Sequence, residues 1–197
     1  MPGQDAAYSN SGYILLGILI ERISGKPYPV FMKEEIFTPL GMDSTFARHE
    51  GIAYPENTAL PYDDGNHLIV DMGSTYGDSG IYSTLNDMYL WDQALYTERL
   101  LRSGTWKIAL TNYTRGDLDY GYGWMIGLDG LSPSYRHGGF EPGGWGRGVD
   151  GGYLIHYYRV PALSFSRLMI SNGGVFANNG FRTWTDEVDR KLRRRYR

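Results

Sequence analysis

The sequence predicts an α+β fold, in which a mainly helical first part is followed by antiparallel strands. Apolar residues in the first part recur at intervals of three and four, as in helices with one buried face. Beyond residue 120, short apolar segments alternate with glycine- and proline-rich turns, and 27 of the 197 residues are glycine. Short turns of this kind join antiparallel strands.

Composition limits the functions that the chain can have. Hydrophobic residues make up 42% and charged residues 21% of the chain, as in a globular domain or two fused lobes. The net charge of −3 argues against a nucleic-acid-binding protein. The chain has no cysteine, which excludes disulfides and thiolate chemistry. Because His49, His67, His137 and His156 lack metal-ligand spacing, we expect no metal and no other cofactor.

No membrane or export signal is visible. The longest apolar run, residues 13–20, is too short to span a bilayer and contains Gly17. Residues 1–5 lack the basic region and apolar core of a signal peptide. We expect no membrane contact, and the compartment stays open.

The first helix is predicted at residues 11–24. Its buried face would be formed by Leu15, Leu16, Leu19, Ile20 and Ile23. Ser11 or Asn10 would cap its start, and Gly25 would end it. A second, short helix is predicted from about Val30 to Phe37, followed by a turn at residues 38–42.

Residues 47–76 have no periodicity and are predicted to form a long ordered loop. The next helix would begin after Thr84, which forms a capping box with Asp87. Its inward face would be formed by Leu85, Met88, Trp91, Asp92 and Leu95. Another short helix is predicted at residues 103–112.

The second half is predicted to contain strands and one helix. The strands are expected near residues 122–127, 134–138, 152–158 and 164–171. The last helix would span about residues 183–195, with acidic residues early and three arginines late, as the helix dipole favours.

Tyr8-Ser9-Asn10, just before the first helix, is the first candidate for chemistry. If nearby cations lower its pKa, the Tyr8 phenol can exchange protons with a serine nucleophile. Asn10 offers a donor and an acceptor to orient a substrate amide. The alternative is a packing tyrosine beside a capping asparagine.

A series of motifs resembles the class C β-lactamase-related serine hydrolases. The matching segments are Pro2-Gly3, Tyr8-Ser9-Asn10, Ile36–Thr45 with its Pro39-Leu40-Gly41-Met42, Gly80–Thr84 with Asp87, Tyr122-Gly123-Trp124, His137-Gly138-Gly139 with Gly143, and Ser171-Asn172-Gly173. The resemblance covers nearly all of the chain, and its specificity comes from the order of the series.

The resemblance implies a serine β-lactamase or DD-peptidase-like fold, in which an antiparallel sheet flanked by helices is paired with a helical lobe. Residues 1–120 would form the mainly helical lobe, and residues 121–197 the C-terminal strands and the last helix.

The resemblance also implies roles for individual residues. Tyr8, Asn10 and His137 would be catalytic. Gly139 would let substrate lie close to its strand, and the Phe140 N–H would donate to an oxyanion. The alternative for His137 is a surface histidine before a Gly-Gly turn.

The family's first motif, S-x-x-K, is absent from this sequence. Lys26, Lys33, Lys107 and Lys191 follow Ile23, Val30, Gly104 and Val188 at the required spacing, and none of these four can attack a carbonyl. The chain therefore looks like the C-terminal two-thirds of the family fold. We expect the intact parent to hydrolyse a small-molecule or peptide substrate through an acyl-enzyme, and this chain to be inactive alone.

The resemblance bears on assembly and compartment as well. Without the family's first strands, an unpaired sheet edge would favour self-association. Many members of the family are periplasmic or secreted.

Two other hypotheses stay open. The chain can be a non-catalytic binding module, or a different hydrolase that uses Ser79 or Ser83. Gly77-Asp78-Ser79-Gly80 imitates the nucleophile loop of trypsin-like proteases, but those enzymes rest on two β-barrels. His137 in place of lysine favours an esterase or peptidase, since a permanent cation suits a lactam carboxylate better.

Overall fold

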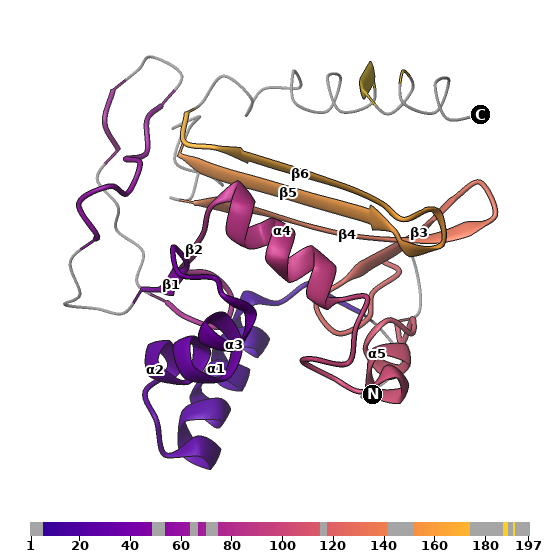
Figure 1. Cartoon of the computed structure of the whole chain (residues 1–197), viewed down its shortest axis with the longest axis horizontal. Coiled ribbons are helices and arrows are strands. Elements are labelled where there is room, and N and C mark those ends of the chain that lie inside the picture. Colours follow the sequence, from indigo (N-terminus) through magenta and orange to yellow (C-terminus); the bar gives the residue numbers. More distant parts are fainter. Residues whose placement is uncertain are drawn as a thin grey trace. The chain divides into compact units, whose positions relative to one another are not determined.

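The computed structural model describes residues 6–48, 54–63, 67–69, 75–114, 118–141, 152–173, 187–188 and 191 (Figure 1). Residue contacts divide the chain into two compact units. One unit contains residues 1–54, 74–138 and 156–169, and the other contains residues 55–73, 139–155 and 170–197. The lobe boundary predicted after residue 120 stays a prediction.

Helix α1 (Asn10–Ser24) confirms the first predicted helix. Its cap differs from the prediction, because the helix begins one residue earlier than expected. The Oγ of Ser9 accepts a hydrogen bond from the Gly12 N–H at 3.2 Å. At the other end, Gly25 takes a left-handed φ of 70°, as expected of a helix-ending glycine.

The apolar stripe predicted to be the buried face of α1 is largely exposed. Leu15, Leu16, Leu19 and Ile23 are 48% to 77% exposed, and only Ile20 of the predicted set packs against the core. Periodicity identifies an apolar face but not the partner that covers it.

A different face of α1 packs against the segment Tyr76–Gly77. A Cβ on Gly17 would lie 3.0 Å from the Tyr76 ring, and a Cβ on Gly77 would lie 2.4 Å from the Tyr13 carbonyl oxygen. Glu21 strengthens this packing, since its carboxylate accepts from the Tyr76 hydroxyl at 2.8 Å. Glycine is therefore required on both sides of the contact.

The second predicted helix is longer than expected. Helix α2 (Tyr28–Met32), the π-helix η1 (Lys33–Phe37) and helix α3 (Thr38–Leu40) follow one another without a break. Gly41 ends the run with a φ of 75°. The buried side chains of this region form the core with those of the following segments: Tyr28, Phe37, Leu40, Met42, Ala47 and Ala94.

Two short strands, β1 (Phe46–Ala47) and β2 (Ile81–Tyr82), pair antiparallel ahead of helix α4 (Leu85–Ala94). The sequence predicted neither strand. Thr84 caps α4 as predicted, accepting from the Asp87 N–H at 3.2 Å. Leu85 is 57% exposed, so the predicted inward face of α4 is wrong at that position. Helix α5 (Ser103–Ala109) is three residues shorter than predicted.

Asp87 links two of the segments that resemble family motifs. Its buried carboxylate accepts from the Thr45 hydroxyl at 2.7 Å and from the Ser44 N–H at 2.9 Å. Thr45 also lies 2.7 Å from the Ser83 hydroxyl. A buried carboxylate with several donors fixes the turn before β1 to the start of α4.

The four predicted strands of the second half are confirmed. They are β3 (Met125–Asp129), β4 (Ser132–Glu141), β5 (Tyr153–Val160) and β6 (Phe165–Ser171), in the order β3-β4-β5-β6. Strands β3 and β4 are antiparallel, with Met125 opposite Arg136. The 3-10 turn η2 (Pro161–Leu163) joins β5 to β6, too short a connection for parallel neighbours.

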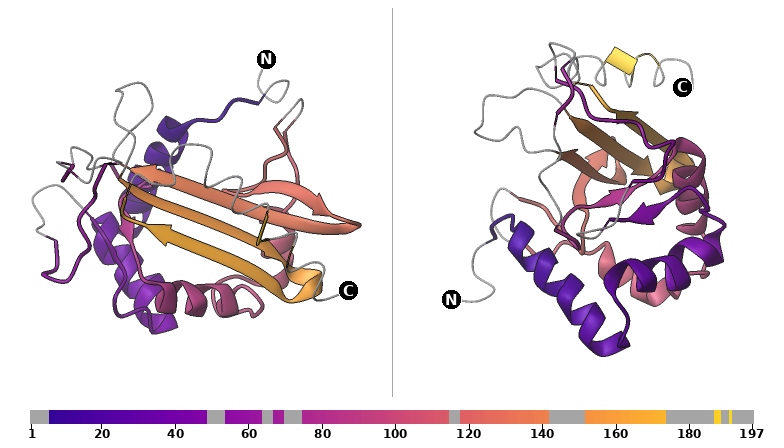
Figure 2. Two further views of the ribbon diagram at one scale, coloured as in Figure 1. Left: turned by 90° about the horizontal axis from the view of Figure 1, so that it is seen from above. Right: turned by 90° about the vertical axis from the view of Figure 1, so that its left-hand side faces the viewer.

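Helix α4 lies beside the sheet (Figure 2), and a buried polar cluster fastens it to the strands of the same unit. The Asp92 carboxylate accepts from the Tyr157 hydroxyl and, at 2.8 Å, from the Ser166 hydroxyl. The Arg159 Nε lies 4.0 Å from the same carboxylate. Asp92 and Arg159 are only 6% and 4% exposed.

The second unit is described in part. Tyr62 pairs with Leu68 in an isolated bridge, and its N–H donates to the Asn172 carbonyl at 2.7 Å. Of the predicted last helix, residues 187, 188 and 191 are helical, and the rest lies outside the described residues. In the described part of the chain, no helix has the length and apolar character needed to cross a membrane.

Replacing Asp92 with alanine is expected to lower the free energy of unfolding by about 3–5 kcal/mol, because it leaves the buried Arg159 without its carboxylate. Urea denaturation measures this change. The matched control is Asp43→Ala in an exposed turn, expected to stay within about 0.5 kcal/mol of the parent. Equal effects in the two variants would contradict the role of Asp92.

His156 is expected to make stability depend on pH. Burial and the positive charges of Arg167 and Arg136 lower its pKa to about 4. A lowered pKa in the folded state stabilises the protein above the ordinary histidine pKa, about 6.5, and that stability is lost as the pH falls through 4. Unfolding of the parent and of His156→Gln between pH 8 and 4 should show a smaller slope for the variant. An unchanged slope would contradict the assignment.

Candidate active site

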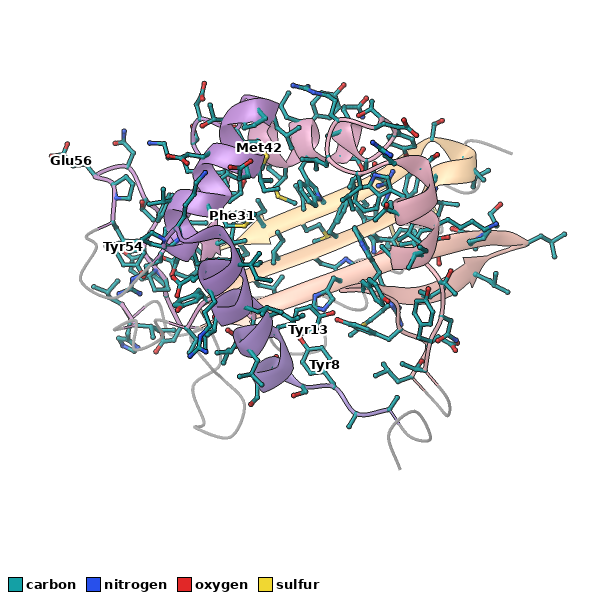
Figure 3. All side chains as sticks on the ribbon, turned by 90° about the horizontal axis from the view of Figure 1, so that it is seen from below. Tyr8, Tyr13, Phe31, Met42, Tyr54 and Glu56 are labelled. Atoms are coloured by element: carbon teal, nitrogen blue, oxygen red, sulfur yellow. The ribbon has the colours of Figure 1, made fainter. Side chains whose placement is uncertain are left out.

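Tyr8 lies immediately before the cap of α1 (Figure 3). Its ring centroid is 6.2 Å from that of His137 and 6.2 Å from that of Tyr120, which it meets edge-on. Tyr8 is 54% exposed, so these ring contacts do not bury it in the core. The packing of α1 on Tyr76–Gly77 holds the chain just after Tyr8 in place.

His137 lies on β4 and is held through both ring nitrogens. Its Nε2 is 2.8 Å from the Tyr120 hydroxyl, and its Nδ1 is 2.7 Å from the Gly138 carbonyl oxygen. Burial lowers the pKa of His137, and the bond to the Gly138 carbonyl only partly offsets this effect. The imidazole is therefore neutral at pH 7.

The pKa of Tyr8 is raised, contrary to the expectation that nearby cations lower it. Burial is the largest cause, followed by electrostatic repulsion from Tyr13 and Asp78. Both of these neighbours are acids, and an acid beside a phenol disfavours the phenolate. Burial also raises the pKa of Tyr120. In this chain the tyrosines of the site hold their protons.

The other predicted residues follow Tyr8 or His137 closely in the sequence. Asn10 is the first residue of α1 and is exposed. Gly139 and Phe140 follow His137 on β4. A Cβ on Gly139 would lie 3.1 Å from the Ile155 methyl group, so a larger residue would crowd β5. The side chain of Phe140 lies outside the described part. Of the five predicted residues, the structure brings together Tyr8 and His137.

Tyr120 and Tyr13 were missed in the sequence. Tyr120 bonds to His137, and Tyr13 adds to the effect of burial in raising the pKa of Tyr120. A signal existed for Tyr120, which opens the segment Tyr120–Trp124 and so belongs to the Y-G-x-G-W pattern. The signal for Tyr13 is weaker: it lies in the first turn of the helix that follows Tyr8.

Ser79 and Ser83 are engaged in local hydrogen bonds. The Ser79 hydroxyl lies 3.2 Å from that of Thr75, and the Ser83 hydroxyl lies 2.7 Å from that of Thr45. These contacts tie turns together. Over the residues that the structure describes, no group of three or more His, Cys, Asp or Glu side chains could hold a metal ion.

Comparison with known proteins gives consistent matches. A family model described as Beta-lactamase matches residues 1–175. The chain is 28% identical over 144 residues to penicillin-binding protein 4* of Bacillus subtilis, covering 64% of this chain and 32% of that protein. It is 28% identical over 143 residues to the D-aminopeptidase of Brucella anthropi, covering 70% of this chain and 28% of that protein.

The fold is also found among solved structures. The penicillin binding protein from Bacillus halodurans superposes with a TM-score of 0.77 at 25% identity, covering 94% of this chain and 57% of that one. This match confirms the predicted α+β class. The chain spans 32% and 28% of the lengths of the two curated relatives.

The Tyr8 phenol is expected to ionise above pH 10, the ordinary tyrosine value, because its pKa is raised. NMR of the chain with 13C at the phenolic carbon of tyrosine follows each ionisation, and Tyr8→Phe assigns the signal. Ionisation of Tyr8 below pH 10 would show a cation beside it and contradict the electrostatics described here.

Proposed function

Since this chain belongs to the Beta-lactamase family, we propose that it supplies the proton-transfer and substrate-holding residues of a serine acyl-transfer site. Tyr8 is the general acid and base, Asn10 and His137 orient the substrate, Gly139 gives it room, and the Phe140 N–H donates to the oxyanion. The intact parent would hydrolyse β-lactam, ester or D-amino-acid peptide bonds. This chain alone is expected to be inactive.

The contact between Tyr8 and His137 is the observation that carries this proposal. The two residues are far apart in the sequence and lie with their ring centroids 6.2 Å apart. A proton-transfer group and a strand that receives the substrate must meet at the reacting bond. Packing alone does not require a half-exposed tyrosine to be placed there.

The electrostatics of the site support a missing cation. Burial raises the pKa of Tyr8 most, the acidic neighbours Tyr13 and Asp78 add to this effect, and burial keeps His137 neutral. The Oδ1 of Asp78 is buried and has no hydrogen-bond partner. A lysine placed beside Tyr8 would reverse this balance, because an opposite charge favours the phenolate. The absent S-x-x-K motif would supply that lysine together with the nucleophile.

The reaction of the complete site follows from these roles. The serine oxygen attacks the substrate carbonyl and gives its proton to Tyr8, while the oxyanion accepts from the Phe140 N–H. Collapse of the tetrahedral intermediate expels the amine or alcohol, which takes the proton from Tyr8. Water then attacks the acyl-enzyme, its proton returns to serine, and the carboxylic acid leaves.

The neutral imidazole of His137 favours amide or ester substrates over β-lactams. A lactam substrate carries a carboxylate that a permanent cation holds well, whereas the neutral ring of His137 carries no charge to attract it. The relative named a D-aminopeptidase fits this preference.

A non-catalytic binding module is the second candidate. It is favoured by the raised pKa of Tyr8, which leaves the phenol a hydrogen-bond donor instead of a base at neutral pH. In that case the site would hold the substrate amide without attacking it. The third hypothesis has Ser79 or Ser83 as the nucleophile. In the described part of the chain, the hydroxyls of these serines lie against those of Thr75 and Thr45 and not against a general base.

Incubation of the folded chain with a fluorophosphonate probe tests inactivity directly. We expect the intact mass to stay unchanged, since the sequence has no serine three residues before a lysine. A stoichiometric adduct would contradict this expectation and reopen Ser79 and Ser83.

The second arm restores the nucleophile. The N-terminal segment of the Bacillus subtilis relative, with its own S-x-x-K, is joined ahead of residue 6 and assayed on a D-amino-acid amide. Hydrolysis is expected to fall at least about 100-fold in Tyr8→Phe, the usual contribution of a general base, and to be unchanged in Tyr113→Phe. A folded chimera that binds substrate but never hydrolyses it would favour the binding module.

A further inference from the structure

We propose that Tyr120 is a positioning residue, whose phenol fixes His137 as a neutral imidazole with its proton on Nδ1. The state of the imidazole follows from the contacts alone. The consequence for catalysis rests on the proposed function. The relevant groups lie in one unit of the chain: Tyr13, Tyr120, His137 and Gly138.

The direction of each hydrogen bond follows from the chemistry of its partners. A backbone carbonyl oxygen only accepts, so the Nδ1 of His137, 2.7 Å from the Gly138 oxygen, must carry a proton. A neutral imidazole has a single N–H, which leaves a lone pair on Nε2. The Tyr120 hydroxyl, 2.8 Å from Nε2, is therefore the donor.

The neutral form that this argument requires is the one that the surroundings favour. Burial lowers the pKa of His137, so the ring is unprotonated near pH 7. Burial also raises the pKa of Tyr120, so its phenol keeps the proton that it donates. The two shifts are consistent with a hydrogen bond from the phenol to the imidazole.

Tyr120 is itself held firmly. Its N–H donates to the Thr114 hydroxyl at 3.0 Å, and its carbonyl accepts from the Tyr113 N–H at 3.2 Å. The result is a directed chain of hydrogen bonds from Tyr120 through His137 to the Gly138 carbonyl.

This chain assigns His137 a specific role. Its only lone pair is occupied by Tyr120, so in this arrangement His137 is not a general base. It instead fixes the Gly138 carbonyl, next along β4 to the peptide that carries the Phe140 N–H. Tyr120 thus acts on the substrate strand through His137, and the proton-transfer role stays with Tyr8.

Imidazole 15N NMR of the chain near pH 7.5 tests the proposal without any activity. In the parent, the His137 Nδ1 is expected to be protonated and the Nε2 to show a hydrogen-bonded lone pair. In Tyr120→Phe, the Nε2 resonance should move toward that of a free lone pair. Tyr113→Phe, a change at an exposed tyrosine, is the matched control and should leave the His137 resonances unchanged. The His156 resonances should be unchanged in both variants.

Two NMR results would overturn the proposal: a proton on Nε2 in the parent, or an Nε2 resonance that Tyr120→Phe leaves in place while the variant stays folded by circular dichroism. Both variants keep the aromatic ring and lose only its hydroxyl group, so we expect both to stay folded. If Tyr120→Phe unfolds, the position of the His137 proton in the parent, on Nδ1 or on Nε2, still decides whether the proposal holds.

Kinetics of the restored chimera provide the second arm. Tyr120→Phe is expected to lower kcat about tenfold with KM nearly unchanged, corresponding to one hydrogen bond lost from the positioned site. An unchanged kcat would contradict the catalytic consequence. An inactive chimera with the expected NMR result would refute the proposed function and leave the assignment of Tyr120 standing.

Discussion

The close approach of Tyr76 and Gly77 to α1 is the constraint on which the candidate site depends. Gly77 has a φ of 95°, and any Cβ there would collide with the Tyr13 carbonyl; Gly17 leaves room for the Tyr76 ring. The Glu21 carboxylate then accepts from Tyr76 and from the Tyr28 N–H at 2.7 Å. These contacts fix the start of α1, and with it the positions of Tyr8 and Tyr13.

The site that results is short of positive charge. Tyr8 meets acidic neighbours, His137 is buried and neutral, and Asp78 keeps an unpartnered buried oxygen. In this arrangement the Tyr8 phenol keeps its proton, because its pKa is raised and not lowered as a general base requires. We propose that a lysine beside Tyr8, as in the S-x-x-K motif, would reverse this shift. The exposed stripe of Leu15, Leu19 and Ile23 lies on the helix that follows Tyr8.

Local signals in the sequence predicted much of the fold. The start of α4 followed from Thr84 and Asp87, and the strands from alternation between glycine-rich turns. The buried face of α1 was not predictable, because periodicity shows an apolar stripe and not its partner. Nor were the long-range hydrogen bonds of Asp87 and Asp92 predictable, because their donors lie far along the chain at Thr45 and Tyr157.

The same limit applies to the site. Tyr8 and His137 were predicted from the order of the motifs, and the structure places them together. Tyr120 required distances, since a tyrosine opening a strand is common and only its 2.8 Å contact with His137 distinguishes it. The sign of the Tyr8 pKa shift also depended on neighbours that no local pattern identifies.

The central claim is that the packing of α1 on Gly77 brings Tyr8 to His137. Nuclear Overhauser effects between the Tyr8 ring and the His137 ring test it most directly in the selectively labelled chain. The account predicts cross-peaks in the parent and their loss in Gly77→Ala, with Gly104→Ala, where a Cβ meets open space, as the control. Absence of the cross-peaks in the folded parent, or their persistence in Gly77→Ala, would contradict it.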